Sequence, residues 1–183
     1  MGVFNSLEKI DTFFSERLSK YACTENIFIS FISFLGSFFV TIIFLAVIYF
    51  LPLANIINLI VVIIISISID TIIVFIIKFS VRRRRKKDKK YFNRIDTYSF
   101  PSGHVSRLSA FILPLINYPV IMFFFLFLVI IVSYARMFRL YHYFTDCFAG
   151  FIIGLFSGML SMILSDVYID LIKNAVDKFF VVM

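Results

Sequence analysis

Residues 27–51 form an uncharged stretch whose 25 positions are all apolar apart from Ser, Thr and Gly. A helix of that length spans about 30 Å of hydrocarbon with some tilt. Hydrophobic residues make up 61% of the chain and charged residues 16%, whereas about a quarter of the residues in a soluble domain are charged. These proportions exclude a water-soluble fold, because a globule of 183 residues cannot bury 26 phenylalanines.

Three further apolar segments follow the first one: residues 53–77, 104–136 and 144–164. Pro114 and the sequence Asn117-Tyr118-Pro119 interrupt the middle segment, which therefore forms either one kinked span or a hairpin of two short spans. No repeat or linker divides the chain. The sequence predicts an all-α, multi-pass transmembrane helical bundle with one membrane domain over residues 27–165.

The two ends of the chain have a different pattern. In residues 1–26, apolar positions recur every three or four residues with charges between them, which is typical of an amphipathic helix lying in the membrane interface. Residues 166–183 are expected to form a short polar and amphipathic tail. The first residues also fit the pattern for N-myristoylation at Gly2, which is short and common.

The charge is concentrated in one loop. The chain has 18 Lys and Arg against 11 Asp and Glu, and most of the cations fall between Lys78 and Arg94. Because this loop lies between two apolar segments, we expect anionic lipid headgroups or a phosphorylated substrate as its partner rather than nucleic acid. The alternative for most of these cations is a structural one: they are solvated and anchor the loop on the positively charged side of the membrane.

Polar residues begin one of the apolar segments as Pro101-Ser102-Gly103-His104. Ser102 is a good helix N-cap, and the free N–H groups of the following turn form an anion site. Gly103 allows the backbone to approach a ligand closely, and His104 adds a titratable donor. The alternative reading is an ordinary helix start.

A second polar group combines Arg136, His142 and Asp146. His142 and Asp146 are four residues apart, so on a helix they share one face and can form a hydrogen bond. A carboxylate on one imidazole nitrogen makes the other nitrogen a better nucleophile or base. The alternative is an interfacial histidine followed by an acidic residue at a helix start. The chain's only two histidines both lie near arginines at span ends. For this reason we favour a catalytic role for His142 and Asp146.

In these motifs the chain resembles the type-2 phosphatidic acid phosphatase superfamily, whose signature reads K-x6-R-P, P-S-G-H and S-R-x5-H-x3-D. The second motif is intact, and the third is present with Ala135 in place of serine. The first motif fits twice, as Lys78-x6-Arg85 and as Lys87-x6-Arg94, and neither is followed by proline. The resemblance covers roughly residues 54–166.

The resemblance implies a metal-independent, cofactor-free phosphohydrolase. In this reading His142 attacks phosphorus and forms a phosphohistidine, Asp146 holds its ring, and His104 protonates the leaving oxygen. The implied phosphate-binding residues are Lys78, Arg85, Ser102, Gly103 and Arg136. Phosphoryl transfer depends chiefly on positioning and on neutralising charge, which fixed cations can supply.

The flanking sequence narrows the resemblance. Residues 96–100 and the Lys78-Phe79-Ser80-Val81 run are similar to the branch that contains presqualene and polyisoprenoid diphosphate phosphatases. The implied substrates are presqualene, farnesyl or geranylgeranyl diphosphate. The alternatives are a broad phosphatidate or sphingoid phosphate phosphatase, and a catalytically weak scaffold that binds anionic lipid. The branch also suggests the endoplasmic reticulum or the nuclear envelope.

If the two histidines meet at one phosphate, the chain between them crosses the membrane an even number of times. Residues 104–136 then form a hairpin, and the bundle has about five spans. The basic segments lie at the same end as the site, and the positive-inside rule places that end in the cytoplasm. We choose Lys78 and Arg85 for the first motif, because Lys78 ends a span, whereas Lys87 lies in a run of like charges.

Two further features lie outside the motifs. Asp70 is an acidic residue within a span, and we expect it to pair with a site cation or to accept a structural hydrogen bond. Gly150, Gly154 and Gly158 form a small-residue stripe, which we interpret as a seam for close helix packing inside the bundle, with a homodimer face as the alternative.

Overall fold

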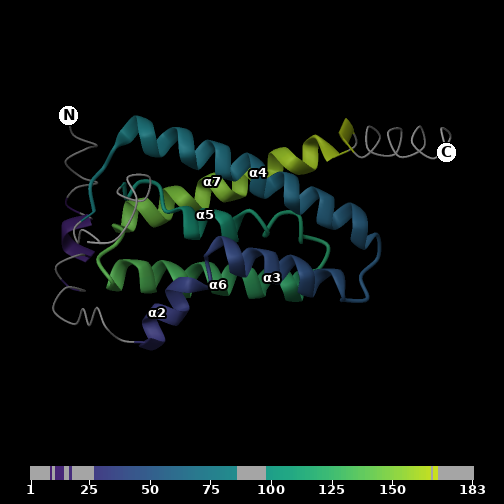
Figure 1. Cartoon of the computed structure of the whole chain (residues 1–183), viewed down its shortest axis with the longest axis horizontal. Coiled ribbons are helices and arrows are strands. Elements are labelled where there is room, and N and C mark those ends of the chain that lie inside the picture. The colour runs from purple at the N-terminus through teal and green to yellow at the C-terminus, as the bar shows by residue number, and fades with distance from the viewer. Residues whose placement is uncertain are drawn as a thin grey trace.

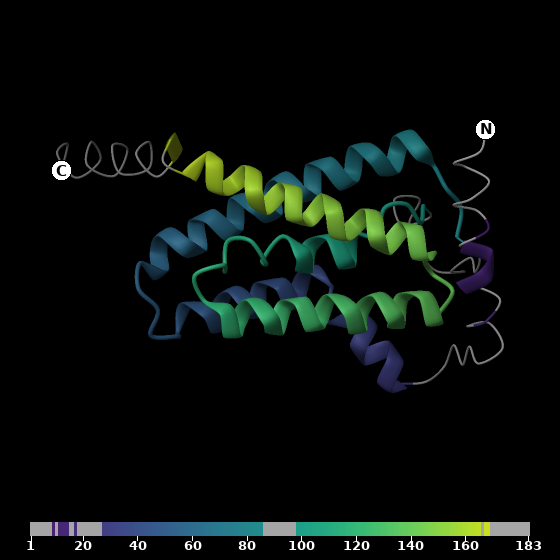
Figure 2. The ribbon, with the colours of Figure 1, turned by 180° about the vertical axis from the view of Figure 1, so that it is seen from behind.

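The computed structural model describes residues 9, 11–14, 17, 27–85, 98–165 and 167–168, which form a bundle of α-helices (Figure 1). The main helices are α2 (Ile27–Phe34), α3 (Phe38–Tyr49), α4 (Ile56–Val81), α5 (Gly103–Ser109), α6 (Pro119–Phe138) and α7 (Phe144–Ile163). The last residues of α4 and α6 and the first residues of α5 and α7 lie at one end of the bundle (Figures 1 and 2). We call this end the histidine end, because His104 and His142 lie there.

Helices α4, α6 and α7 are each long and apolar enough to cross a membrane. Helices α2 and α3 reach that length only as a bent pair, so the described residues provide three spans, or four with the pair. Their outward faces carry many exposed Phe, Ile and Val side chains, which suits a lipid surrounding. The predicted all-α, multi-pass membrane fold is confirmed.

The stretch 27–51, predicted as one continuous span, is instead broken between α2 and α3, which are bent by 63°. At Gly36 in this break, an added Cβ would come within 2.7 Å of the Cβ of His104, so only a residue without a side chain fits. Ser37 then caps α3, its hydroxyl accepting a hydrogen bond from the Val40 N–H at 3.5 Å. We call residues 35–37 the elbow. The apolar sequence of residues 27–51 does not indicate this break, because the break depends on a contact with His104, which is distant in the sequence.

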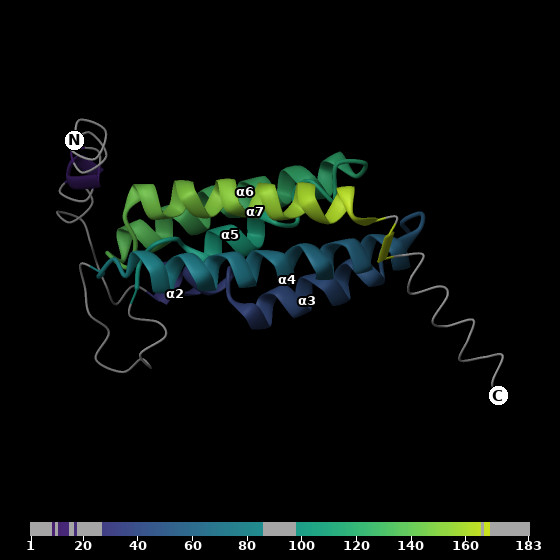
Figure 3. The ribbon, with the colours of Figure 1, turned by 90° about the horizontal axis from the view of Figure 1, so that it is seen from above.

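The chain from 103 to 117 runs away from the histidine end and α6 returns to it, which forms the predicted hairpin (Figure 2). Its first arm is not a regular span, because α5 has only seven residues and turns continue to residue 117. Pro114 has no N–H to donate to the carbonyl of Ala110, and that carbonyl accepts a hydrogen bond from Ser66 Oγ at 2.8 Å instead. Helix α5 lies alongside α7 and also contacts α6 and α4 (Figure 3).

The glycine stripe of α7 packs against α5 and the turns that follow it. An added Cβ on Gly150 would lie 2.6 Å from the carbonyl oxygen of Ser102, and one on Gly154 would clash with the carbonyl oxygen of Ser106. An added Cβ on Gly158 would meet Pro114 Cδ at 3.1 Å. The first arm therefore fills the stripe, which confirms the predicted seam inside the bundle.

We expect Gly154→Ala to lower the free energy of unfolding by about 1–3 kcal/mol, the usual cost of overpacking a well-packed interior. The Ser106 carbonyl that the new methyl group would meet is helix backbone and cannot rotate away. Unfolding in mixed micelles by increasing SDS measures the loss. Gly158→Ala serves as a graded control and is expected to cost less, since its nearest neighbour is 3.1 Å away. Equal stability of Gly154→Ala and the unmodified protein would contradict this packing.

Part of the N-terminal segment packs on the histidine end. Asp11 is buried and accepts hydrogen bonds from the backbone N–H of Thr145 at 3.0 Å and from its hydroxyl at 2.6 Å. Phe14 stacks on Phe144 with ring centroids 4.8 Å apart. The amphipathic pattern of residues 1–26 does not indicate these contacts. Gly2 and most of the predicted interfacial helix lie outside the described residues, as does most of the tail.

Candidate active site

Arg136 connects the two histidines of the chain. Its Nη2 donates to Nε2 of His142 at 2.8 Å, and its Nη1 lies 3.5 Å from Nε2 of His104. Arg136 and His142 are buried, with 3% and 5% of their surfaces exposed. Residues from two of the sequence motifs therefore meet at one guanidinium, on elements that the chain brings together only through the hairpin.

The hydrogen bonds of His142 determine its tautomer. A guanidinium can only donate, so Nε2 of His142 accepts from Arg136 and carries no proton. Nδ1 lies 2.7 Å from the carbonyl oxygen of Ser99, which can only accept, so Nδ1 holds the proton. The Nε2 lone pair, the nucleophilic site of a neutral imidazole, is thereby directed toward Arg136 and His104.

The sequence predicts that Asp146 holds the His142 ring through a hydrogen bond along one helix face. In the structure α7 begins at Phe144, so His142 lies in the preceding loop. Its Nδ1 is 3.6 Å from Asp146 Oδ2, beyond hydrogen-bond distance. The ring is instead positioned by the Ser99 carbonyl, and Asp146 is a nearby buried charge.

Asp146 has other partners that fix the start of α7. Its Oδ2 accepts from the backbone N–H of Tyr143 at 2.9 Å, which caps the helix. Its Oδ1 accepts from Arg83 Nη1 at 2.8 Å. Arg83 also pairs with Asp11, with 2.6 Å between Nη2 and Oδ2. The carboxylate therefore anchors the loop that carries His142 through backbone and cationic contacts.

Sequence reasoning missed Arg83, Ser99 and Asp11. Arg83 is one of four consecutive arginines, and nothing in that run distinguishes it. Ser99 acts through its carbonyl group, which every residue possesses. The backbone N–H of Ser99 donates to the Arg83 carbonyl at 2.8 Å, and Arg84 pairs antiparallel with Tyr98. This pairing folds the end of the basic loop back over the site, a route that only the three-dimensional structure reveals.

Burial lowers the pKa of His142 well below its ordinary value, and the neighbouring charges of Arg136, Arg85 and Lys78 lower it further. The first-motif pair that we chose thus acts electrostatically on the nucleophile candidate. Arg85 is buried, with 7% of its surface exposed, whereas Lys78 closes the last turn of α4. The competing pair, Lys87 and Arg94, lies outside the described residues.

We expect the His142 ring to remain neutral far into the acid range. An isolated histidine takes up a proton near pH 6.5, while the lowered pKa of His142 postpones protonation to a lower pH. Between these two values the unfolded chain binds a proton that the folded chain does not, so stability falls as the pH drops through this window. Side-chain ¹⁵N spectra of the histidine-labelled protein measure the midpoint. A midpoint at or above about 6.5 would contradict the buried, cation-flanked position.

Ser102 and Gly103 are both buried at the start of α5. Ser102 occupies the N-cap position as predicted, but its side chain makes no capping hydrogen bond. Its backbone N–H donates to the carbonyl of Asp146 at 2.9 Å, which joins the starts of α5 and α7. Both residues lie next to His104 in the chain, where the sequence expects phosphate oxygens to bind.

A cavity of about 470 Å³ opens beside His104, between the elbow and the helices α5 and α6. Arg107, Arg136 and Arg139 line it together with His104, and Phe38 is among the aromatic residues of its wall. None of the described residues that line it is acidic. A cavity that combines cations with aromatic side chains suits an anionic headgroup attached to an apolar chain.

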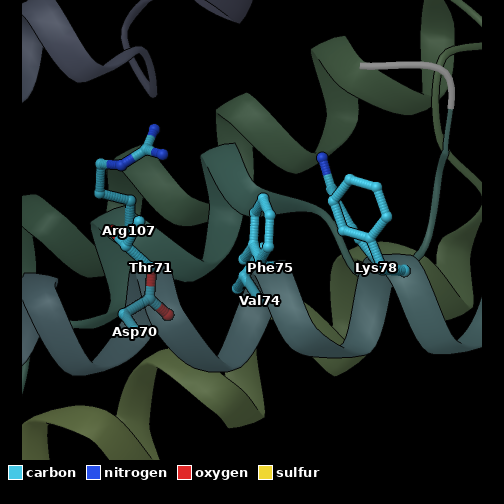
Figure 4. Close-up of a pocket in the computed structure, with 7 residues that line it drawn as sticks. Asp70, Thr71, Val74, Phe75, Lys78 and Arg107 are labelled. Atoms are coloured by element: carbon cyan, nitrogen blue, oxygen red, sulfur yellow. The ribbon is translucent and has the colours of Figure 1, made fainter. Parts of the chain in front are cut away.

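A smaller cavity of about 300 Å³ lies on the α4 side of α5, where Asp70, Lys78 and Arg107 contribute to the lining (Figure 4). Asp70 is buried and accepts a hydrogen bond from the hydroxyl of Ser106. Of the two alternatives for Asp70, the structural hydrogen bond is therefore present. Within the described part of the chain, no group of three His, Cys, Asp or Glu residues could hold a metal ion.

The fold and the site define a multi-pass helical membrane protein with a His–Arg–His arrangement at one end, in which Arg136 and His142 are buried. The sequence profile of the PAP2 superfamily matches residues 56–169, more than half of the chain. The chain belongs to the PAP2 superfamily, whose members are phosphatases, so phosphohydrolase activity is supported. The family resemblance read from the motifs is confirmed.

Two solved structures are similar to this chain. A PAP2-type transmembrane phosphatidylglycerolphosphate phosphatase from Bacillus subtilis aligns with a TM-score of 0.69 and 16% identity, over 88% of this chain and 87% of that one. LpxE from Aquifex aeolicus aligns with a TM-score of 0.57 and 22% identity, over 74% of this chain and 84% of that one. No curated protein sequence matches. At these identities the likeness concerns the fold.

Proposed function

We propose that the protein is a metal-independent phosphohydrolase that removes phosphate from isoprenoid diphosphates through a phosphohistidine on His142. The observation that carries the proposal is the orientation of the His142 ring. Nδ1 donates to the Ser99 carbonyl, and the Nε2 lone pair faces the guanidinium that also contacts His104. The proposal therefore assigns the nucleophile to His142, the cation to Arg136 and the proton donor to His104. The catalytic domain of this proposal covers residues 27–165.

In the first step, Nε2 of His142 forms a bond to the terminal phosphorus, and the bond between phosphorus and the bridging oxygen breaks. Burial and the neighbouring cations lower the pKa of His104, and the negative charge of the bound diphosphate offsets them, so His104 enters this step protonated and gives its proton to that oxygen as it leaves. The His142 ring becomes positive, and the Ser99 carbonyl at 2.7 Å and the Asp146 carboxylate at 3.6 Å stabilise it. Arg136 exchanges its imidazole contacts for phosphoryl oxygens, which neutralises charge in the transition state.

In the second step, a water molecule attacks the phosphorus of the phosphohistidine. His104, now neutral, takes a proton from the water, and the bond between Nε2 and phosphorus breaks. Phosphate leaves, and His142 returns to the neutral tautomer with its proton on Nδ1. Lys78 and Arg85 hold phosphoryl oxygens with Arg136, together with Ser102 and the Gly103 N–H.

The specific lipid rests on the sequence resemblance to the polyisoprenoid diphosphate branch. The cavity beside His104 supports an amphiphilic substrate, because cations and aromatic side chains line it together. A broad phosphatidate or sphingoid phosphate phosphatase would use the same site. The buried and mutually oriented His142 and Arg136 argue against a scaffold that only binds lipid, since lipid headgroups could be bound by exposed cations at lower cost.

The same proposal includes an orientation. Arg82, Arg83, Arg84 and Arg139 lie at the histidine end, whereas the loops at the opposite end carry no charge. By the positive-inside rule the site faces the cytoplasm, in the endoplasmic reticulum or the nuclear envelope. Labelling of an Asp88→Cys variant in sealed vesicles tests this. If the introduced cysteine reacted with a reagent on the lumenal side, the proposed orientation would be wrong.

Phosphate release from a lipid panel in the presence of EDTA tests the function. The purified protein should hydrolyse farnesyl, geranylgeranyl and presqualene diphosphates faster than phosphatidate, and EDTA should not reduce the rates. A preference for phosphatidate or sphingoid phosphates would favour the broad phosphatase. If the folded protein released phosphate from none of these lipids, the lipid-binding scaffold would be the remaining alternative.

A further inference from the structure

Arg107 has no role in the reaction described above, yet it borders the site. It lies one turn after His104 on α5 and lines both cavities, one on each side of that helix. Figure 4 shows its guanidinium extending away from Asp70 on α4. Among the described residues, no carboxylate forms an ion pair with it.

The hydrogen bonds of Arg107 leave donor capacity unused. Nη1 donates to the carbonyl of Gly36 in the elbow at 3.0 Å. Nε is buried and has no hydrogen-bond partner within the described chain. A buried guanidinium donor without an acceptor is costly, and an anion in the cavity would remove that cost.

The depth of Arg107 suggests which anion it meets. Helix α5 runs from the histidine end into the bundle (Figure 2), so Arg107 lies about 4.5 Å deeper along the helix than His104. The cavity wall near Arg107 includes Phe38, whose ring lies 5.8 Å from the guanidinium carbon. Phe38 and Phe39 are 56% and 73% exposed toward the lipid side. From the site toward the lipid, the imidazole of His104 comes first, the guanidinium of Arg107 second, and the aromatic ring of Phe38 third.

We infer that Arg107 binds the second, lipid-linked phosphate of a diphosphate substrate and thereby selects diphosphates over monophosphates. The inference rests on the proposed function and deepens it. When His142 attacks the terminal phosphorus, the bridging bond breaks and its electron pair goes to the departing lipid monophosphate. His104 protonates the bridging oxygen, and Arg107 neutralises the charge that remains on the leaving phosphate.

Farnesyl diphosphate and farnesyl monophosphate form a matched pair of probes, because they share one chain and differ by one phosphate. Arg107→Gln should lower kcat/KM for the diphosphate at least about tenfold and leave that for the monophosphate within about threefold. Arg107→Lys, which keeps the charge, should lie between the two. Both substrates are assayed on one preparation, so any loss of folded protein cancels from the ratio.

Arg139→Gln is the matched control. Arg139 lines the same cavity, but it follows Arg136 at the outer end of α6 and contacts Tyr141. Its removal should change both substrates alike. Equal losses for the two substrates in Arg107→Gln, or a changed ratio only in Arg139→Gln, would overturn the inference while the proposed function stands. If the unmodified protein hydrolyses neither substrate, the proposed function itself fails.

Discussion

His142→Ala is expected to abolish hydrolysis of lipid phosphates and to eliminate any phosphorylated enzyme intermediate. The substitution removes the imidazole whose Nε2 accepts a hydrogen bond from Arg136 at 2.8 Å and whose Nδ1 is fixed by the Ser99 carbonyl. Phosphate release from farnesyl diphosphate measures the loss, and size-exclusion chromatography verifies that the variant is folded. A near-native rate would remove His142 from its assigned role.

His104→Ala, the companion variant, should have a weaker and more selective effect. General acid catalysis contributes about 10²–10⁴-fold, so turnover of lipid substrates should fall at least to the lower end of that range. Formation of the phosphoenzyme from a substrate whose leaving group needs no proton, such as p-nitrophenyl phosphate, should slow much less, and the initial burst of p-nitrophenol measures that step. Equal slowing of phosphoenzyme formation with both kinds of leaving group would indicate that His104 binds phosphate instead of donating a proton.

Lys78→Gln and Arg85→Gln should each lower kcat/KM at least about tenfold, which corresponds to about 1.4 kcal/mol of lost transition-state stabilisation. Both cations lie near enough to His142 to lower its pKa. Lys78 closes α4, and Arg85 is buried. A cation held in place before the reaction contributes more than a mobile one, because no ordering is needed during the step. Steady-state kinetics at fixed ionic strength measure the effect.

Lys87→Gln and Arg94→Gln are the matched controls, because they remove the same charge from the competing copy of the first motif. They should cost little beyond a weaker attraction to anionic membranes, which added salt masks. If the control pair proved sensitive and Lys78 and Arg85 proved tolerant, the phosphate clamp would be assigned to the wrong copy. The roles of His104, His142 and Arg136 would not depend on that outcome.

The long spans could be read from the sequence because apolar length is a local pattern, whereas the meeting of the motifs was expected from the family resemblance. Apolar length predicted α4, α6 and α7, and the glycine stripe predicted a packing seam inside the bundle without indicating which segment fills it. The elbow could not be predicted, because the break at Gly36 accompanies a close contact with His104 that exists only in the folded structure. The sequence also assigned the His142 ring to Asp146 by helical spacing, although α7 starts two residues after His142.

The residues that escaped prediction act across long sequence separations. Ser99 positions His142 through its carbonyl group, which leaves no signature in a side-chain motif. Arg83 joins Asp11 to Asp146, and both partners are far from it in the chain. The role inferred for Arg107 depends on the two cavities that it lines, and these form only in the folded bundle. Such contacts arise from the folded bundle, so a single sequence cannot specify them.

Trapping the intermediate tests the central claim most directly. The His104→Ala variant is mixed with a ³²P-labelled substrate that has a good leaving group, quenched in alkali within milliseconds and digested for mass spectrometry. Phosphohistidines survive alkali and are lost in acid, so the label should be alkali-stable and acid-labile and should map to the peptide containing His142. Label on a different residue, or turnover without any phosphoenzyme, would contradict the account.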